Sequence, residues 1–233
     1  MKKKILLAGA AGVIGQRLSR LLVEDGWPVV GTTRSPQKAA KLRSIGIEPV
    51  VVDVFDTESL RSVLATVRPE IVIHQLTDLP PGLDPAKMPE AAVRNARIRD
   101  VGTRNLLNAA LPVGVERVIA QSIAFVYAPG SMPYTEDAPL DPSAQGVISL
   151  EQQVLSAPLE SIVLRYGRFY GPETGFNTPP DGCAVHVDAA ADAARRAITQ
   201  GERGVYNIAE DGGTVSTTKA TRELGWQADF RIN

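Results

Sequence analysis

The sequence is poor in the residues that build disulfides, metal sites and aromatic clusters. Its 233 residues include one cysteine, Cys183, two histidines, His74 and His186, and only 5% aromatic residues. A single cysteine forms no intrachain disulfide, which fits a reducing compartment, so we expect a cytoplasmic protein. The cysteine and the histidines lack the spacing of metal ligands, so we expect no bound metal.

Long apolar runs and an excess of charge of either sign are also missing. No apolar stretch reaches the roughly 18 residues that span a bilayer, and the N-terminal one enters a glycine turn rather than a cleavage site. The net charge is −1, and the one tight basic run, Lys2 to Lys4, precedes the first expected strand. A nucleic-acid surface needs a clustered basic excess, so we expect neither nucleic acid nor membrane as a partner.

Strand and helix patterns alternate over the first two-thirds of the chain. Short apolar runs predict strands at 5–8, 28–32, 47–52, 70–74, 115–121 and 161–165. Between them, helical spacing predicts helices at 13–24, 36–44 and 57–66, a long one ending near 110, and one ending near 156. Strands separated by such helices pair in parallel through right-handed crossovers, which predicts a doubly wound α/β sheet.

A glycine-rich turn follows the first strand. Residues 5–15 read ILLAGAAGVIG, with glycines at 9, 12 and 15 between a strand and a helix. The first permits a tight turn, the second lets the backbone approach a pyrophosphate at the helix start, and the third lets the helix pack against the strand. This context predicts a Rossmann-type nicotinamide dinucleotide site built from Gly9, Ala11, Gly12, Val13, Ile14 and Gly15.

The end of the second strand bears on the choice of cofactor. NAD sites usually place Asp or Glu there for the ribose 2′-OH, but this sequence reads Thr33-Arg34-Ser35. Arg34 can pair with a 2′-phosphate, and Thr33 or Ser35 can add donors, so NADP is favoured over NAD. Asp53, after the third strand, can accept a hydrogen bond from the adenine amino group.

Motifs along nearly the whole chain resemble one family. GAAGVIG, VVVDVFD, VIHQLTD, VGTRNLLNAA, QSIAFVYAPG and LRYGRFYGP resemble the extended short-chain dehydrogenase/reductase family, in its NAD-dependent epimerase/dehydratase branch. The resemblance implies a Rossmann domain over 1–166 and a small, reduced cap over 167–233, interleaved with the last sheet elements. It implies a possible homodimer through helices near 90–110 and 145–156. It also extends the cofactor site to Val54, Gln75, Leu76, Thr77, Gln121, Tyr166 and Arg168.

The sequence departs from this family at the catalytic positions. The family uses a Ser or Thr, a Tyr, and a Lys four residues after the Tyr. Aligned on Val126-Tyr127-Ala128, the Ser/Thr position is Ile123, with Ser122 one residue early. Gly146 stands at the Tyr position and Leu150 at the Lys position. These residues carry no titratable group, so the usual proton relay cannot operate.

Other side chains are candidates for catalysis. Ser122, Tyr127 and Tyr166 are the ones we single out. Each also has a structural interpretation: Ser122 can satisfy backbone groups at a strand end, and the two tyrosines can pack under loops. Arg168 can bind an anionic substrate or pair with a carboxylate such as Asp188.

The sequence is compatible with two functions. The first is an NADP-dependent oxidoreductase or isomerase of a small molecule, with an unusual proton donor. The second is a non-catalytic NADP(H)-binding redox sensor or regulatory protein. A nucleotide-sugar epimerase is disfavoured, because the short C-terminal region offers few basic residues for a nucleotide diphosphate. Those residues are Arg195, Arg196, Arg203, Lys219 and Arg222.

Overall fold

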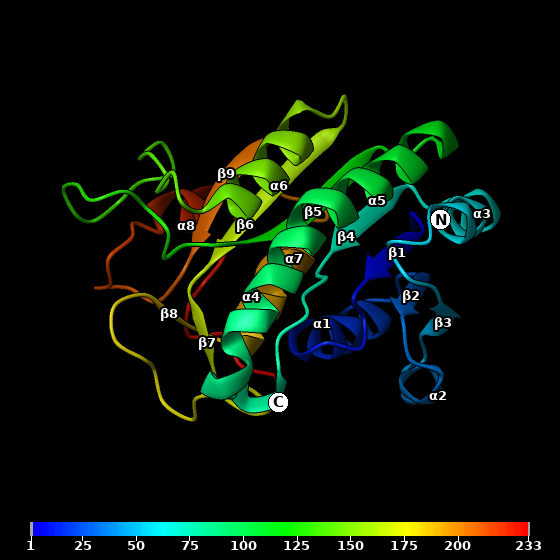
Figure 1. The fold of residues 1–233 in the computed structure, drawn as a ribbon, viewed down its shortest axis with the longest axis horizontal. Helices are drawn as coiled ribbons and strands as arrows, with labels where there is room; N and C mark the ends of the chain where they lie inside the picture. The colour runs from blue at the N-terminus through cyan, green and yellow to red at the C-terminus, as the bar shows by residue number, and fades with distance from the viewer. Residues whose placement is uncertain (1, 233) are drawn as a thin grey trace.

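A seven-stranded parallel sheet forms the centre of the computed structural model, which describes residues 2–232. The strand order is β3-β2-β1-β4-β5-β6-β9, so the winding direction reverses between β1 and β4. This is the predicted doubly wound sheet, and the prediction is confirmed (Figure 1). The strands are β1 (Ile5–Ala8), β2 (Val29–Thr33), β3 (Glu48–Val51), β4 (Ile71–His74), β5 (Arg117–Ile123), β6 (Glu160–Tyr166) and β9 (Gly204–Ile208).

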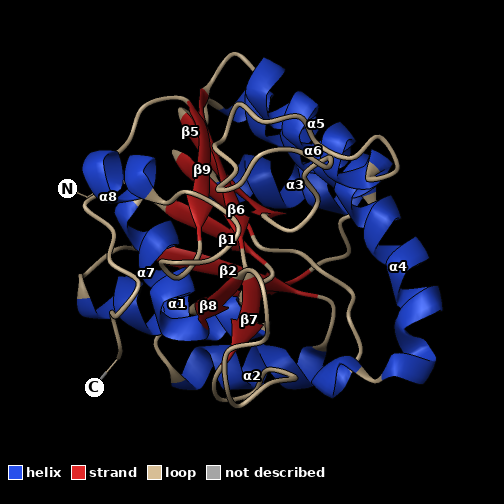
Figure 2. Ribbon diagram, turned by 90° about the vertical axis from the view of Figure 1, so that its left-hand side faces the viewer, coloured by secondary structure: helices blue, strands red, loops and turns tan. Residues whose placement is uncertain are grey.

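Helices cover both faces of the sheet. One apolar core joins the sheet to α1, α2, α7 and α8, and two others join it to α3, α5 and α6. Figure 2 shows the strands between these two layers. The helices are α1 (Val13–Glu24), α2 (Pro36–Ser44), α3 (Thr57–Val67), α4 (Met88–Arg97), α5 (Thr103–Ala110), α6 (Gln145–Ser156), α7 (Val187–Arg196) and α8 (Thr218–Leu224). Among the described residues, no helix is long and apolar enough to cross a membrane.

Side-chain caps fix the starts of two helices beside the β2 and β3 ends. The Ser35 hydroxyl accepts a hydrogen bond from the Lys38 amide at 3.3 Å, which starts α2 as the Ser-Pro pair predicts. The Asp56 carboxylate accepts from the Ser59 amide at 3.0 Å and starts α3. Asp53 is therefore not needed as a cap, and its position after β3 leaves it available to the cleft described below.

The long helix predicted to end near residue 110 is interrupted. A π-turn, Ile98–Gly102, separates α4 from α5, although the run stays continuous in Figure 1. The turn packs against α6: the Ser149 hydroxyl lies 2.8 Å from an Asp100 carboxylate oxygen, and the Gln153 amide donates to the Asp100 carbonyl at 3.1 Å. The preceding proline-rich loop contains two short 3₁₀ turns, Pro81–Leu83 and Pro85–Lys87.

The C-terminal third divides between the main unit and a small cap. Helix α7 packs on α1, and β9 pairs with β6, so both belong to the central layers. The cap is a two-stranded parallel sheet, β7 (Arg168–Tyr170) and β8 (Ala184–His186), with its loops. The buried Trp226 indole, which donates to the Ala189 carbonyl at 2.8 Å, ties the segment after α8 to α7.

Candidate dinucleotide site

A cleft lies at the carboxyl ends of β1, β2 and β4, where the winding reverses and ligands of doubly wound sheets bind. The predicted cofactor residues that line it are Gly9, Ala11, Gly12, Thr33, Arg34, Asp53, Val54, Gln75, Leu76 and Thr77. The remaining lining, which the sequence did not single out, is Ala8, Thr32, Lys38, Val52, Phe55, Leu60, Ile98 and Leu106.

The glycine turn has the geometry that its sequence predicts. Gly9 has a φ of +88°, and a Cβ there would lie 2.6 Å from the Gln75 carbonyl oxygen. A Cβ at Gly15 would lie 2.2 Å from the Gly9 carbonyl oxygen, so only glycine allows this approach of helix to turn. Gly12 begins α1 without a side-chain cap, and the first turn of α1 carries no acidic residue. The amides there fit a pyrophosphate.

The other predicted residues of this region lie behind the turn or farther along the sheet. Ile14 packs its side chain into the core, and Gly15 packs against the turn itself, so neither lines the cleft. Ser35 is engaged in capping α2. The predicted contacts of Val13, Gln121, Tyr166 and Arg168 with a cofactor remain predictions.

Positive charge borders the cleft at the end of β2. Arg34 and Lys38 both line it, and Lys38 lies in the first turn of α2. Arg34 is half-exposed and lies 3.4 Å from the carboxylate of Asp78, across from β2. Asp78 also pairs with Arg94 of α4 at 3.2 Å. Because Asp78 keeps a second cation, Arg34 can leave it for another anion at modest cost.

Asp53 lines the cleft, and buried His74 lies behind its lining at the end of β4. An Asp53 carboxylate oxygen accepts from the Phe55 amide at 2.9 Å, which holds the carboxylate beside the cleft. Buried His74 accepts from the Leu76 amide through Nδ1 at 3.2 Å, and its Nε2 lies 3.0 Å from the Thr103 hydroxyl. Burial, with a smaller contribution from Arg99, lowers the pKa of His74 to about 4. The ring is therefore neutral and holds the strand end in place.

The family's catalytic positions are filled with packing residues. Leu150 is buried in the core between α6 and the sheet. Gly146 lies against α4, where a Cβ would stand 3.0 Å from the Cα of Ala96. Ile123 is the last residue of β5. None of these side chains can carry a proton, as the sequence predicts.

A buried ion pair lies beside those positions. Arg165 of β6 donates to both carboxylate oxygens of Glu151 of α6, at 2.9 and 2.6 Å. The Ser122 hydroxyl donates to the same carboxylate at 2.6 Å. The interpretation of Ser122 as a partner of strand-end backbone groups is therefore wrong, because β5 continues to Ile123 and Ser122 faces α6 within the strand. Its hydroxyl hydrogen is committed to Glu151.

Tyr127 is held by the same cluster. Its hydroxyl donates to Asn207 Oδ1 at 2.6 Å and accepts from Arg165 Nη1 at 2.8 Å. Its ring stacks on Tyr134 with centroids 5.1 Å apart. Burial raises the pKa of Tyr127, although Arg165 opposes the shift. The packing interpretation of Tyr127 fits this arrangement, because its proton is already engaged by the protein.

Tyr166 differs from the other two candidates. Its hydroxyl is buried beside the Gln75 side chain, and burial raises its pKa. Within residues 2–232, neither that hydroxyl nor the amide of Gln75 has a well-formed hydrogen bond. Buried polar groups are rarely left so, which marks this end of the cleft as fitting a polar ligand.

Arg168 and Phe125 follow β6 and β5. The Arg168 guanidinium lies over the Phe125 ring, 4.5 Å from its centroid, and both side chains are exposed. Asp188, considered above as a partner for Arg168, pairs instead with Arg17 of α1 at 3.0 Å. Arg168 has no ion pair in the described part of the chain.

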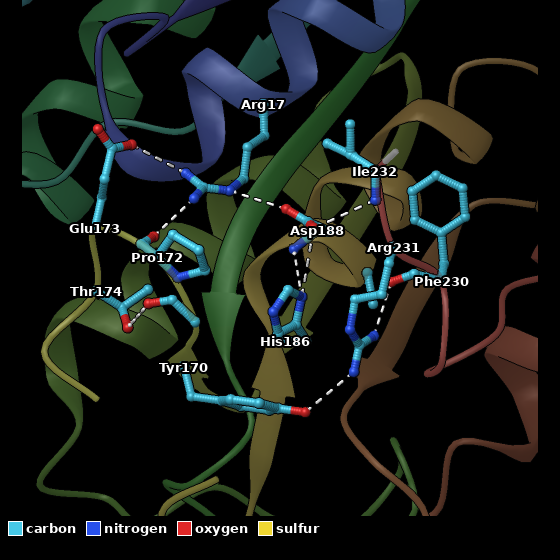
Figure 3. A network of polar contacts seen from close by, with 12 residues as sticks. Arg17, Tyr170, Pro172, Glu173, Thr174, His186, Asp188, Phe230, Arg231 and Ile232 are labelled. Carbon is cyan, nitrogen blue, oxygen red and sulfur yellow. Dashed lines mark hydrogen bonds and ion pairs between the residues drawn. The ribbon is translucent and has the colours of Figure 1, made fainter. Parts of the chain in front are cut away.

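A polar network fastens the cap to α1 (Figure 3). Arg17 reaches from α1 to Asp188, to Glu173 and to the Pro172 carbonyl. His186 caps α7 by accepting from the Asp188 amide at 3.2 Å. These contacts set the loop after β7 relative to the glycine turn.

The C-terminal basic residues are occupied. Arg195 pairs with Asp25 and Asp192, and Arg196 also pairs with Asp192. Three other basic residues of this region donate hydrogen bonds within the protein. Arg203 donates to the Leu155 carbonyl, Lys219 to the Val205 carbonyl and Arg222 to the Glu223 carboxylate. A nucleotide diphosphate would have to compete for each of them.

Comparison with known proteins establishes the family. The model of the NAD dependent epimerase/dehydratase family matches residues 5–184, and the chain belongs to that family. It is thus a member of an NAD(P)-dependent oxidoreductase family of the epimerase/dehydratase type, for which a nicotinamide dinucleotide is the typical cofactor. The glycine turn, the uncapped start of α1 and the unpartnered groups beside β4 fit such a cofactor.

Individual relatives differ in what they act on. A 3-diazoavenalumate denitrifying reductase from Streptomyces is 37% identical, over 89% of this chain and 76% of that protein. A UDP-N-acetyl-alpha-D-glucosaminuronate decarboxylase from Bacillus cytotoxicus is 29% identical, over 74% of this chain and 56% of that protein. The UDP-glucose 4-epimerase structure from Thermotoga maritima superposes with a TM-score of 0.80 at 20% identity, over 98% of this chain and 94% of that one, which shows the shared fold.

Proposed function

We propose that this protein is an NADPH-dependent reductase that delivers a hydride to an electron-poor small molecule without a proton from the protein. The observation that carries the proposal is the state of the candidate proton donors. Ser122 donates to Glu151 and Tyr127 donates to Asn207, and the family's Tyr and Lys positions hold Gly146 and Leu150. The hydroxyl of the third candidate, Tyr166, has no such partner among the described residues, but its burial raises its pKa and so opposes release of its proton. A reduction that needs no proton donor is compatible with such a site.

Reduction of a diazo group meets that condition. The similar Streptomyces protein is a reductase of 3-diazoavenalumate. When bound, the reduced nicotinamide supplies a hydride. An arenediazonium gains this hydride as a new C–H bond, the C–N bond breaks, and its electron pair leaves with N₂. No proton enters, whereas reduction of a carbonyl needs one for the oxygen.

The choice of NADPH rests on the charge at the end of β2. Arg34 and Lys38 line the cleft, and no acid follows Thr33 to receive a ribose 2′-OH. Both cations favour a 2′-phosphate. In the C-terminal region, the paired state of Arg195 and Arg196 of α7 and of Arg222 of α8 speaks against a nucleotide-sugar substrate.

The lack of a proton donor also suits a non-catalytic NADP(H)-binding protein. A test for oxidation of NADPH by a substrate distinguishes this function from that of a reductase. The absorbance of NADPH at 340 nm is followed with 3-diazoavenalumate and with a panel of aromatic aldehydes. We expect oxidation of NADPH with the diazo compound and little with the aldehydes. Binding of NADPH without oxidation by any of these compounds would favour the sensor.

A further inference from the structure

Arg99 is a cation without a partner beside the cleft. It lies in the π-turn between α4 and α5, next to Ile98, which lines the cleft. Its side chain is half-buried, and burial lowers its pKa. In the part of the chain that the structure describes, no hydrogen bond or ion pair reaches its guanidinium. A half-buried guanidinium has lost part of its hydration, so an anion that pairs with it regains favourable electrostatic energy.

The position of Arg99 follows from its neighbours. Four residues later in the same helical run, Thr103 contacts His74 at the carboxyl end of β4. Crossover helices run opposite to the strands, so Arg99 lies beyond that end, over the crevice. The positive charge of Arg99 helps to lower the pKa of His74, and the negative charge of Glu151 raises the pKa of Arg99 against the larger effect of burial. Glu151 acts on Arg99 only through space, because Arg165 and Ser122 occupy the hydrogen-bonding positions of its carboxylate.

The anionic groups of the cofactor have other positions available. The glycine turn and the start of α1 suit the pyrophosphate, and Arg34 with Lys38 suits a 2′-phosphate, at the ends of β1 and β2. Arg99 lies beyond the end of β4 instead, where its charge acts on His74. Arg168, stacked on Phe125, adds a second cation and a flat apolar surface after β6 and β5. This end of the crevice suits a planar anion.

We propose that Arg99 binds the anionic group of the substrate, and that the substrate is a planar aromatic carboxylate. The proposal rests on the proposed function for the place of the substrate beside the nicotinamide, but it concerns binding alone. A half-buried guanidinium that has no hydrogen-bonded partner in the protein discriminates between an anion and its neutral isostere, because only the anion forms a charge-assisted pair with it.

The test uses trans-cinnamate and its neutral isostere trans-cinnamamide as probes. Each is titrated calorimetrically into the full chain saturated with NADP⁺, in the wild type, in Arg99→Gln and in Arg104→Gln. Arg104 is an exposed arginine of the same helical run, paired with Asp100, and serves as the matched control. We expect the wild type to bind cinnamate at least tenfold more tightly than cinnamamide. R99Q should lose this preference, and R104Q should keep it.

The same titrations, extended to NADPH, can overturn the assignment of Arg99. Loss of NADPH affinity in R99Q as large as the loss for cinnamate would assign Arg99 to the cofactor and overturn the proposal. So would a wild type without preference for cinnamate, or an R99Q that keeps it. Should R99Q fail to fold, Arg99→Lys, which retains the charge, is expected to keep a weaker preference, and its absence there counts against the proposal. Failure of the chain to oxidise NADPH would refute the proposed function but not these results.

Discussion

Replacement of Arg34 by alanine tests the cofactor preference directly. In the free protein this arginine is 50% exposed and pairs with Asp78 at 3.4 Å, an ion pair worth about 0.2–1 kcal/mol in such a setting. A charge-assisted contact with a 2′-phosphate is worth about 1.5–3 kcal/mol. The difference of about 1–2 kcal/mol corresponds to a five- to thirtyfold change in Kd.

The expected result is selective. Arg34→Ala should weaken NADPH binding by about tenfold and leave NADH binding unchanged, because NADH has no 2′-phosphate. Both are measured by the fluorescence of the bound nicotinamide in one titration series. Arg43→Ala, which removes an exposed arginine at the other end of α2, is the matched control and should change neither affinity. Equal losses for both dinucleotides, or no loss for NADPH, would refute the reasoning.

Three further predictions concern neighbouring groups. Asp78→Asn should tighten NADPH binding about threefold without affecting NADH, because it frees Arg34 from its ion pair; weaker NADPH binding in this titration would contradict the role given to Asp78. Ser122→Ala and Tyr127→Phe should each keep NADPH oxidation within about threefold of the wild type. Each should lower the unfolding free energy in urea titrations by about 1 kcal/mol, because the Ser122 hydroxyl donates to Glu151 and the Tyr127 hydroxyl donates to Asn207. Loss of turnover in the folded variants would restore them as catalytic residues. The pKa of His74 lies below that of an unfolded histidine, so the unfolded chain gains the proton first as the pH drops. The unfolding free energy should therefore fall between about pH 6.5 and pH 4, by up to about 3 kcal/mol. His74→Asn should lack this part of the pH dependence, and parallel profiles of unfolding free energy against pH in the two proteins would disprove it.

The cofactor half of the site could be predicted because its geometry is local. Gly9 and Gly15 are separated by only five residues of turn and helix, so their spacing alone specifies the approach. Arg34 follows a strand whose end must lie at the crevice. Lys38 could have been found by the same reasoning, because the Ser-Pro start of α2 puts it in the first helical turn beside Arg34.

The other half depends on contacts between distant segments. Glu151 and Arg165 belong to a helix and a strand whose relative register no local pattern determines, and their pairing decides that Ser122 is a structural residue. The π-turn that presents Arg99 arises within a run that reads as one helix. Asp78 lies in a loop, and only the folded sheet brings it to Arg34.

Isotope transfer tests the central claim, that NADPH supplies the hydrogen and the protein supplies no proton. The chain is incubated with 3-diazoavenalumate and NADPH carrying two deuterium atoms at the nicotinamide C4, in ordinary water, and the product is analysed by mass spectrometry. The account predicts one deuterium at the ring carbon that loses nitrogen, and none there when unlabelled NADPH is used in D₂O. A hydrogen that comes from the solvent, or no turnover at all, would contradict it.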